Sequence, residues 1–154
     1  SRKVNERAAL YPIQLIHRYV ESSKFSLSEL NVLIIGIAFK GIPETKDVRS
    51  SVSIDLLNEL KGKVKNVYGW DAVIKSKALN KLGFKVSETL EKAIGNANVV
   101  LIMNNHPDNI CSDIYIPSKN VKLIFDGWNQ LNKMEVEKAV GLIYATMGYM
   151  TPND

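Results

Sequence analysis

The chain has 154 residues and a formal net charge of +4, and 45% of its residues are hydrophobic. This suits one domain, or one domain with an attached helix, around a substantial core. The basic residues are scattered rather than gathered into stripes, which disfavours nucleic-acid binding. No apolar run approaches the ~18 residues of a membrane span and no signal peptide opens the chain, so a cytoplasmic protein without membrane association is expected.

The first segment of the chain has the pattern of a helix. Apolar residues recur at helical spacing from Lys3 to about Val20, with Pro12 predicted to kink or break the helix. A short polar stretch follows, up to Glu29. We interpret residues 1–30 as a helix and linker that dock on the domain formed by residues 31–154.

From residue 32 onward, short apolar segments alternate with helical patterns. Strands are predicted at 32–36, 64–70, 84–86, 98–104, 121–126 and 142–146, helices at 51–61, 73–82, 88–95 and 131–139, and an irregular or helical segment at 107–114. Such alternation implies right-handed crossovers and a parallel sheet with helices on both faces. The predicted fold class is α/β and Rossmann-like, preceded by an N-terminal helix.

In open α/β sheets, ligands bind at the carboxyl ends of the strands. Function should therefore lie in the loops after Ile35, Trp70, Met103 and Phe125.

The loop after the first strand carries two cations, Lys40 and Arg49. Lys40 follows an apolar strand directly, which places it at the rim of the sheet, where it could bind an anion; a plain surface lysine is the alternative. Arg49 could bridge phosphates or could pair with one of the acids nearby along the chain: Asp47, Glu44 or Asp55. The helix predicted after this loop can be capped by Ser50 or Ser51 and would add free backbone N–H groups.

A dinucleotide-binding fingerprint is present only in degraded form. The aligned triplet is Gly36, Ala38 and Gly41, so a methyl group occupies the position where the backbone should approach a pyrophosphate. Asp71 ends the second strand, where a ribose-binding acid would lie, but it comes 30 residues after Gly41 instead of the usual ~20. Another phosphorylated nucleotide is therefore favoured over NAD in this cleft.

Other side chains give weaker signals. Phe39 and Trp128 present flat apolar faces at two neighbouring loop tips, where they could stack on a base or cover the end of the sheet. Cys111 is the single cysteine, and His17 and His106 stand alone. The sequence therefore predicts no disulfide, no metal site and no catalytic constellation.

Six motifs, in order and at matching spacing, resemble the C-terminal UDP-binding domain of the UDP-glucose/GDP-mannose dehydrogenase family. They are Gly36-Ile-Ala-Phe-Lys40, Asp47-Val-Arg49-Ser-Ser, the strand end Val67-Tyr-Gly-Trp-Asp71, the strand Asn98 to Met103, Phe125-Asp126-Gly127 and Ile143-Tyr144-Ala-Thr-Met-Gly148. The resemblance covers about residues 31–150, and the opening helix looks like the tail of the family's central dimerisation segment. The parent enzyme is then expected to be a homodimer or a higher homo-oligomer.

The resemblance implies a dehydrogenase that oxidises the C6 alcohol of a nucleotide sugar to a carboxylate in two NAD-dependent steps. In the family, NAD binding and the catalytic cysteine belong to upstream elements, and Cys111 does not match that cysteine. This chain alone is expected to be inactive and to hold the UDP end of UDP-glucose or a UDP-N-acetylhexosamine. A GDP-mannose dehydrogenase domain and a non-catalytic nucleotide-binding module are the alternatives.

By position, Phe39 and Lys40 match the family's substrate contacts, and Arg49 matches an arginine that reaches toward NAD. Trp128 is a further substrate-binding candidate, at a position where the family often has arginine. The loop from Lys40 to Arg49 also looks longer than in many members, which bears on the reach of Arg49.

Overall fold

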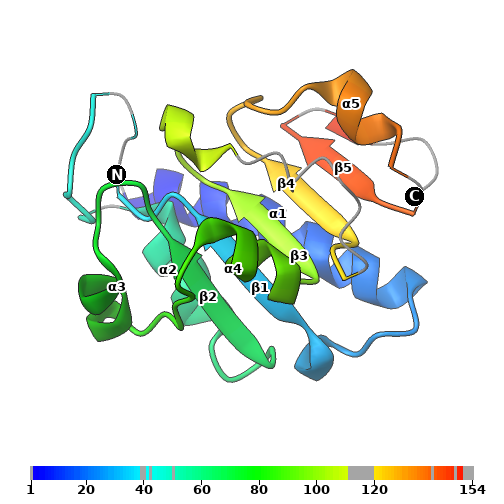
Figure 1. Cartoon of the computed structure of the whole chain (residues 1–154). Coiled ribbons are helices and arrows are strands. Elements are labelled where there is room, and N and C mark those ends of the chain that lie inside the picture. The colour runs from blue at the N-terminus through cyan, green and yellow to red at the C-terminus, as the bar shows by residue number, and fades with distance from the viewer. Residues whose placement is uncertain are drawn as a thin grey trace.

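A six-stranded sheet forms the centre of the molecule (Figure 1). The computed structural model describes residues 2–38, 41, 43–49, 51–110, 120–139, 141–147 and 149–150. The strands are β1 (Asn31–Ile35), β2 (Asn66–Trp70), β3 (Val99–Ile102), β4 (Leu123–Asp126), β5 (Ile143–Thr146) and β6 (Tyr149–Met150). Their order is β2-β1-β3-β4-β5-β6, and the first five are parallel. The predicted parallel sheet is confirmed.

Two features at the ends of the sheet differ from the prediction. β6 pairs antiparallel with β5, because the two residues between them leave no room for a crossover helix and the chain must turn straight back. The predicted strand 84–86 is reduced to one parallel bridge between Tyr68 and Lys85. Lys85 still exchanges two backbone hydrogen bonds of 2.9 Å with β2, so this segment borders the sheet beyond β2.

In the described residues, five helices and two short 3-10 turns precede or connect the strands. They are α1 (Arg2–Ser22), η1 (Leu27–Glu29), α2 (Val52–Leu60), α3 (Ser76–Leu82), α4 (Leu90–Asn96), η2 (Pro107–Asn109) and α5 (Lys133–Glu137). α1 continues through Pro12, so of the predicted kink or break, the break does not occur. The cost of the missing N–H is offset by packing, because Leu15 and Ile16 are buried against the sheet.

The helices cover both faces of the sheet, as predicted. α1, α2 and α3 share one apolar cluster with Val32 and Ile34 of β1. α4 and α5 share the other cluster with Leu33 and Ile35. Because successive side chains of a strand point to opposite faces, β1 contributes to both clusters, which explains why its sequence is continuously apolar.

The ends of the helices follow the local sequence. The side chain of Ser51 accepts a hydrogen bond from the backbone N–H of Ser53 and so caps α2, and Thr89 caps α4 in the same way through Lys92. Gly83 ends α3 in the left-handed conformation. The cap at Ser51 fixes the point at which the long loop after β1 returns to regular structure.

Gly36, directly after β1, is expected to tolerate no side chain. Its φ is +90°, and an added Cβ would lie 2.6 Å from Cγ and Oδ1 of Asn104. We expect Gly36→Ala to lower the free energy of unfolding by about 3 kcal/mol, measured by urea denaturation. Gly95 in α4 has open space around it, so Gly95→Ala should instead raise the free energy of unfolding by about 0.5–1 kcal/mol. Equal effects of the two substitutions would contradict this account.

Candidate functional site

The loops after β1, β2, β3 and β4 meet at the carboxyl edge of the sheet, because these strands are parallel. The chain leaves β1 toward β2 on one side and later returns to place β3 on the other side. This reversal is the topological switch point at which open α/β sheets bind ligands. The predicted site residues therefore belong to loops that border the switch point or lie next to it.

Asp71 fastens the loop after β1 to the end of β2. Its Oδ2 accepts hydrogen bonds from the backbone N–H groups of Ile37 and Ala38, at 2.7 and 2.8 Å. Its Oδ1 accepts from Val73 and Ile74, at 2.8 and 3.0 Å. The residue is 8% exposed. Its carboxylate thus serves as a backbone anchor, and this arrangement offers no support for a ribose-binding role.

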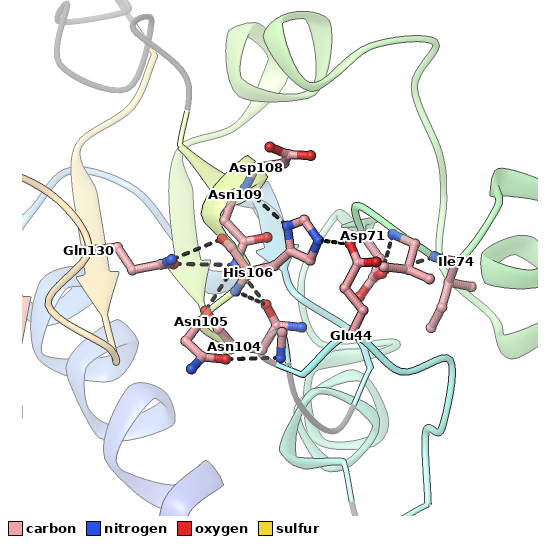
Figure 2. A network of polar contacts seen from close by, with 11 residues as sticks. Glu44, Asp71, Ile74, Asn104, Asn105, His106, Asp108, Asn109 and Gln130 are labelled. Carbon is pink, nitrogen blue, oxygen red and sulfur yellow. Dashed lines mark hydrogen bonds and ion pairs between the residues drawn. The ribbon is translucent and has the colours of Figure 1, made fainter.

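The loop after β3 holds the loop after β1 from the opposite side (Figure 2). Nδ2 of Asn104 donates to the carbonyl of Ala38 at 3.2 Å, and Oδ1 of Asn105 accepts from the backbone N–H of Gly41 at 2.9 Å. Asn104 is buried and is held in turn by Asn109, whose Nδ2 donates to its carbonyl oxygen and its Oδ1 at 2.9 and 2.7 Å. The two loops therefore form one connected polar network.

His106 lies in the middle of this network, 4% exposed. Its Nδ1 accepts a hydrogen bond from the backbone N–H of Asp108 at 3.0 Å, and its Nε2 contacts the carboxylate of Glu44. Because Nδ1 uses its lone pair, Nε2 carries the proton and donates it to Glu44. The sequence showed His106 only as an isolated histidine, since its partner lies 62 positions away.

Asp126 organises the loop after β4 in the way that Asp71 organises its own loop. It is fully buried, and its Oδ1 accepts from the backbone N–H groups of Trp128 and Gln130, at 3.2 and 3.0 Å. Its Oδ2 accepts from the N–H of Leu131 at 2.8 Å and the hydroxyl of Tyr144 at 2.9 Å. These bonds fix the position of Trp128 relative to the sheet.

Trp128 lies at the end of β3 and remains 50% exposed. Its indole Nε1 donates to the carbonyl of Met103 at 3.2 Å. The ring therefore covers part of the strand end, as one of the two sequence interpretations held, and still offers apolar surface to a ligand. A substrate-binding role for Trp128 stays a prediction.

Arg49 projects from the loop after β1, with its side chain 88% exposed. It pairs with Asp47: Nε and Nη2 donate to the two carboxylate oxygens at 3.0 and 2.9 Å. Of the three acids considered as partners, Asp47 is the one that Arg49 contacts. Hydrogen bonds from the Arg49 side chain and backbone hold the pKa of the Asp47 carboxyl below its usual value, and the same pairing raises the pKa of Arg49.

Phe39 and Lys40, the other two candidates, lie outside the described residues, as does Cys111. Their described neighbours, Ala38 and Gly41, are both held by the loop after β3. Among the residues that the structure describes, no group of three potential metal ligands occurs. In the same part of the chain, no helix combines the length and the apolar character that crossing a bilayer requires.

Removing the guanidinium of Arg49 should raise the pKa of Asp47. Since the pKa of the folded state is depressed, the pairing stabilises the loop at neutral pH and is lost as the pH falls through that lowered value. We expect Arg49→Gln to move the Asp47 pKa toward its ordinary value in a carboxyl ¹³C NMR titration. Lys63→Gln, which removes an ion pair with Glu59 on α2, is the control and should leave Asp47 unchanged. An Asp47 pKa that stays low in Arg49→Gln would refute the pairing.

Several solved structures have a similar fold. They include a UDP-D-ManNAc dehydrogenase from Pyrococcus horikoshii, at 24% identity and a TM-score of 0.74, and a UDP-glucose dehydrogenase from Pyrobaculum islandicum, at 23% and 0.67. An NDP-N-acetyl-D-galactosaminuronic acid dehydrogenase from Methanosarcina mazei is similar at 20% and 0.72. The comparisons cover 95%, 93% and 95% of this chain, but the chain spans only 32%, 30% and 30% of those proteins.

Sequence similarity defines the family more directly than these structures, whose identities are low. No curated protein matches the chain. The model of the UDP-binding domain of the UDP-glucose/GDP-mannose dehydrogenase family, however, matches residues 33–133, from β1 to the first residue of α5. That range includes the four loops that follow β1, β2, β3 and β4 at the carboxyl edge. The chain therefore belongs to the UDP-glucose/GDP-mannose dehydrogenase family and contains its UDP-binding domain.

Proposed function

We propose that this chain is the UDP-sugar-binding domain of an NAD-dependent nucleotide-sugar 6-dehydrogenase that acts on UDP-glucose or a UDP-N-acetylhexosamine. The family match over residues 33–133 carries the proposal, because it includes the loops at the carboxyl edge of the sheet. Similar structures bear the names of dehydrogenases of both substrate types. The alternative within the family is a GDP-mannose dehydrogenase, and outside it a nucleotide-binding module without catalysis.

In this proposal, the loops after β1 and β4 share the substrate. Lys40 neutralises the diphosphate, and Phe39 and Trp128 offer apolar faces to the uracil. The exposed indole of Trp128 supports its part, since half of the residue is open to solvent at the end of β3. A tryptophan at this place gives a stacking surface where many family members have a charge.

Arg49 is proposed to reach NAD across a cleft between this domain and an upstream one. Its exposed guanidinium pairs with Asp47 at the protein surface, so a pyrophosphate can compete for it. NAD itself would be bound mainly by the upstream domain, which would also supply the catalytic cysteine. The role of this chain is then to hold the nucleotide end of the sugar, and it has no catalytic residues of its own.

Residues 1–30 are proposed to be the tail of a central dimerisation segment with its linker, and residues 31–154 to be the UDP-binding domain. The packing of α1 supports a docked helix, because Leu15 and Ile16 are buried in the same cluster as α2. The parent enzyme would be a homodimer or higher homo-oligomer in the cytoplasm, making uronates for nucleotide-sugar or surface-polysaccharide metabolism.

Lys40→Ala tests the substrate site. We expect it to weaken UDP binding about tenfold in a calorimetric titration, since it removes a charge-assisted contact to the diphosphate. Lys65→Ala is the matched control: Lys65 is an exposed lysine next to β2, but at the amino edge of the sheet. Equal UDP affinities for the two variants would count against the site. Parallel titrations with GDP and NAD show which nucleotide the chain prefers, and a preference for GDP over UDP would favour the GDP-mannose dehydrogenase alternative.

Arg49→Ala tests the cofactor contact in the whole parent enzyme. The apparent KM for NAD should rise several-fold, because one charged partner of the pyrophosphate is lost. Lys46→Ala removes another exposed cation from the same loop and should leave the KM for NAD unchanged. If Arg49→Ala also left it unchanged, Arg49 would serve only to order the loop through Asp47.

A further inference from the structure

We propose that Asn104, Asn105 and His106 form a positioning clamp for the nucleotide-binding loop. Three consecutive side chains after β3 hold three evenly spaced points of the loop after β1, at Ala38, Gly41 and Glu44. The inference rests on the proposed function, in which this loop contacts the UDP-sugar. The three clamp residues are assigned here as positioning residues, which act on the ligand through the loop.

The clamp uses a different kind of group at each point. Asn104 donates from its amide to the carbonyl of Ala38, and Asn105 accepts from the N–H of Gly41. His106 donates from Nε2 to the carboxylate of Glu44. Of the three loop partners, Ala38 and Gly41 bond through the backbone and Glu44 bonds through its side chain. Figure 2 shows the imidazole between the Asp108 backbone on one side and Glu44 on the other.

The clamp itself is held firmly. Asn109 donates to both oxygens of Asn104, and Nε2 of Gln130 donates to the carbonyl of His106 at 2.9 Å. The N–H of Asp108 fixes the tautomer and orientation of the imidazole, so the Nε2 proton is aimed at Glu44 before any ligand arrives. Such support from surrounding hydrogen bonds is what a preorganised binding site needs.

The loop also fits against the clamp without intervening side chains. A Cβ added to Gly41 would lie 1.9 Å from the backbone nitrogen of His106. The contact is therefore one backbone against another, and a residue larger than glycine would displace the loop from the clamp.

The position of the clamp gives it a role in binding. Ala38 and Gly41 flank Phe39 and Lys40, the proposed substrate contacts, on both sides. The described residues of the loop from 41 to 49 form no helix or strand, so its order depends on side-chain contacts, among them those with the loop after β3. Holding both flanks before the ligand binds reduces the conformational entropy that binding must remove. Loss of a clamp bond should then weaken UDP binding although the clamp touches no ligand.

Glu44 offers the cleanest test because its side chain is 64% exposed and its replacement should not disturb the core. We expect Glu44→Ala to weaken UDP binding about fivefold in a calorimetric titration of the whole chain, at a temperature where its melting curve shows that the variant is folded. Glu44→Gln keeps an oxygen that accepts from Nε2 of His106 and should restore most of the affinity. Glu59→Ala, an exposed acid on α2, is the control.

Asn105→Ala gives an independent readout at the second point. Amide hydrogen exchange at Gly41 should become several-fold faster, since its N–H loses its acceptor, and UDP affinity should fall. Wild-type UDP affinity in both Glu44→Ala and Asn105→Ala would overturn the clamp, as would a Glu44→Gln variant no better than Glu44→Ala. If the unaltered chain bound no UDP, the proposed function would fail. Amide exchange at Gly41 alone would then test the clamp. Faster exchange in Asn105→Ala would support the clamp, and unchanged exchange would overturn it.

Discussion

The hydrogen bonds that the Asp71 carboxylate accepts are the interaction on which the site depends. As the chain leaves β1, the N–H groups of Ile37 and Ala38 lose their sheet partners, and both find an acceptor in this one buried side chain. Asn104 then holds Ala38 from the β3 side. The loop after β1 is thus held by hydrogen bonds from the residues that follow β2 on one side and β3 on the other. Asp126 provides the same kind of anchor after β4, so the carboxyl edge is ordered before a ligand is present.

The fold could be predicted largely from local patterns. The apolar run of β1 and the alternation of strands and helices gave the parallel sheet with both faces covered. The structure departs from these patterns where a tertiary or neighbouring element decides the outcome. α1 passes Pro12 without a break because one face is buried, the segment at Lys85 keeps one bridge, and β6 pairs with the edge that β5 offers.

The site was predicted only in outline. The sequence placed Arg49 and Trp128 in loops at the carboxyl edge of the sheet, where the structure has them. The binding roles of these two residues and of Phe39 and Lys40 remain predictions. The sequence indicated Asp71 as a possible ribose ligand, and it gave His106 no role. Asp71 binds Ile37 and Ala38, 34 and 33 positions away, and His106 contacts Glu44, 62 positions away. Sequence spacing says nothing about which of these loops the sheet order brings together.

Buried and exposed charged side chains have different roles at the carboxyl edge of the sheet. The buried carboxylates of Asp71 and Asp126 accept from backbone N–H groups and order the loops, whereas the pair between Arg49 and Asp47 lies at the surface, where an ion pair contributes little to stability. Binding of UDP at this edge can be observed directly through the changes in amide NMR shifts when UDP is added. We predict shifts at Ile37, Ala38, Gly41 and Trp128, with Asn66 at the amino edge unchanged. Shifts centred on the amino edge, or none at saturating UDP, would contradict it.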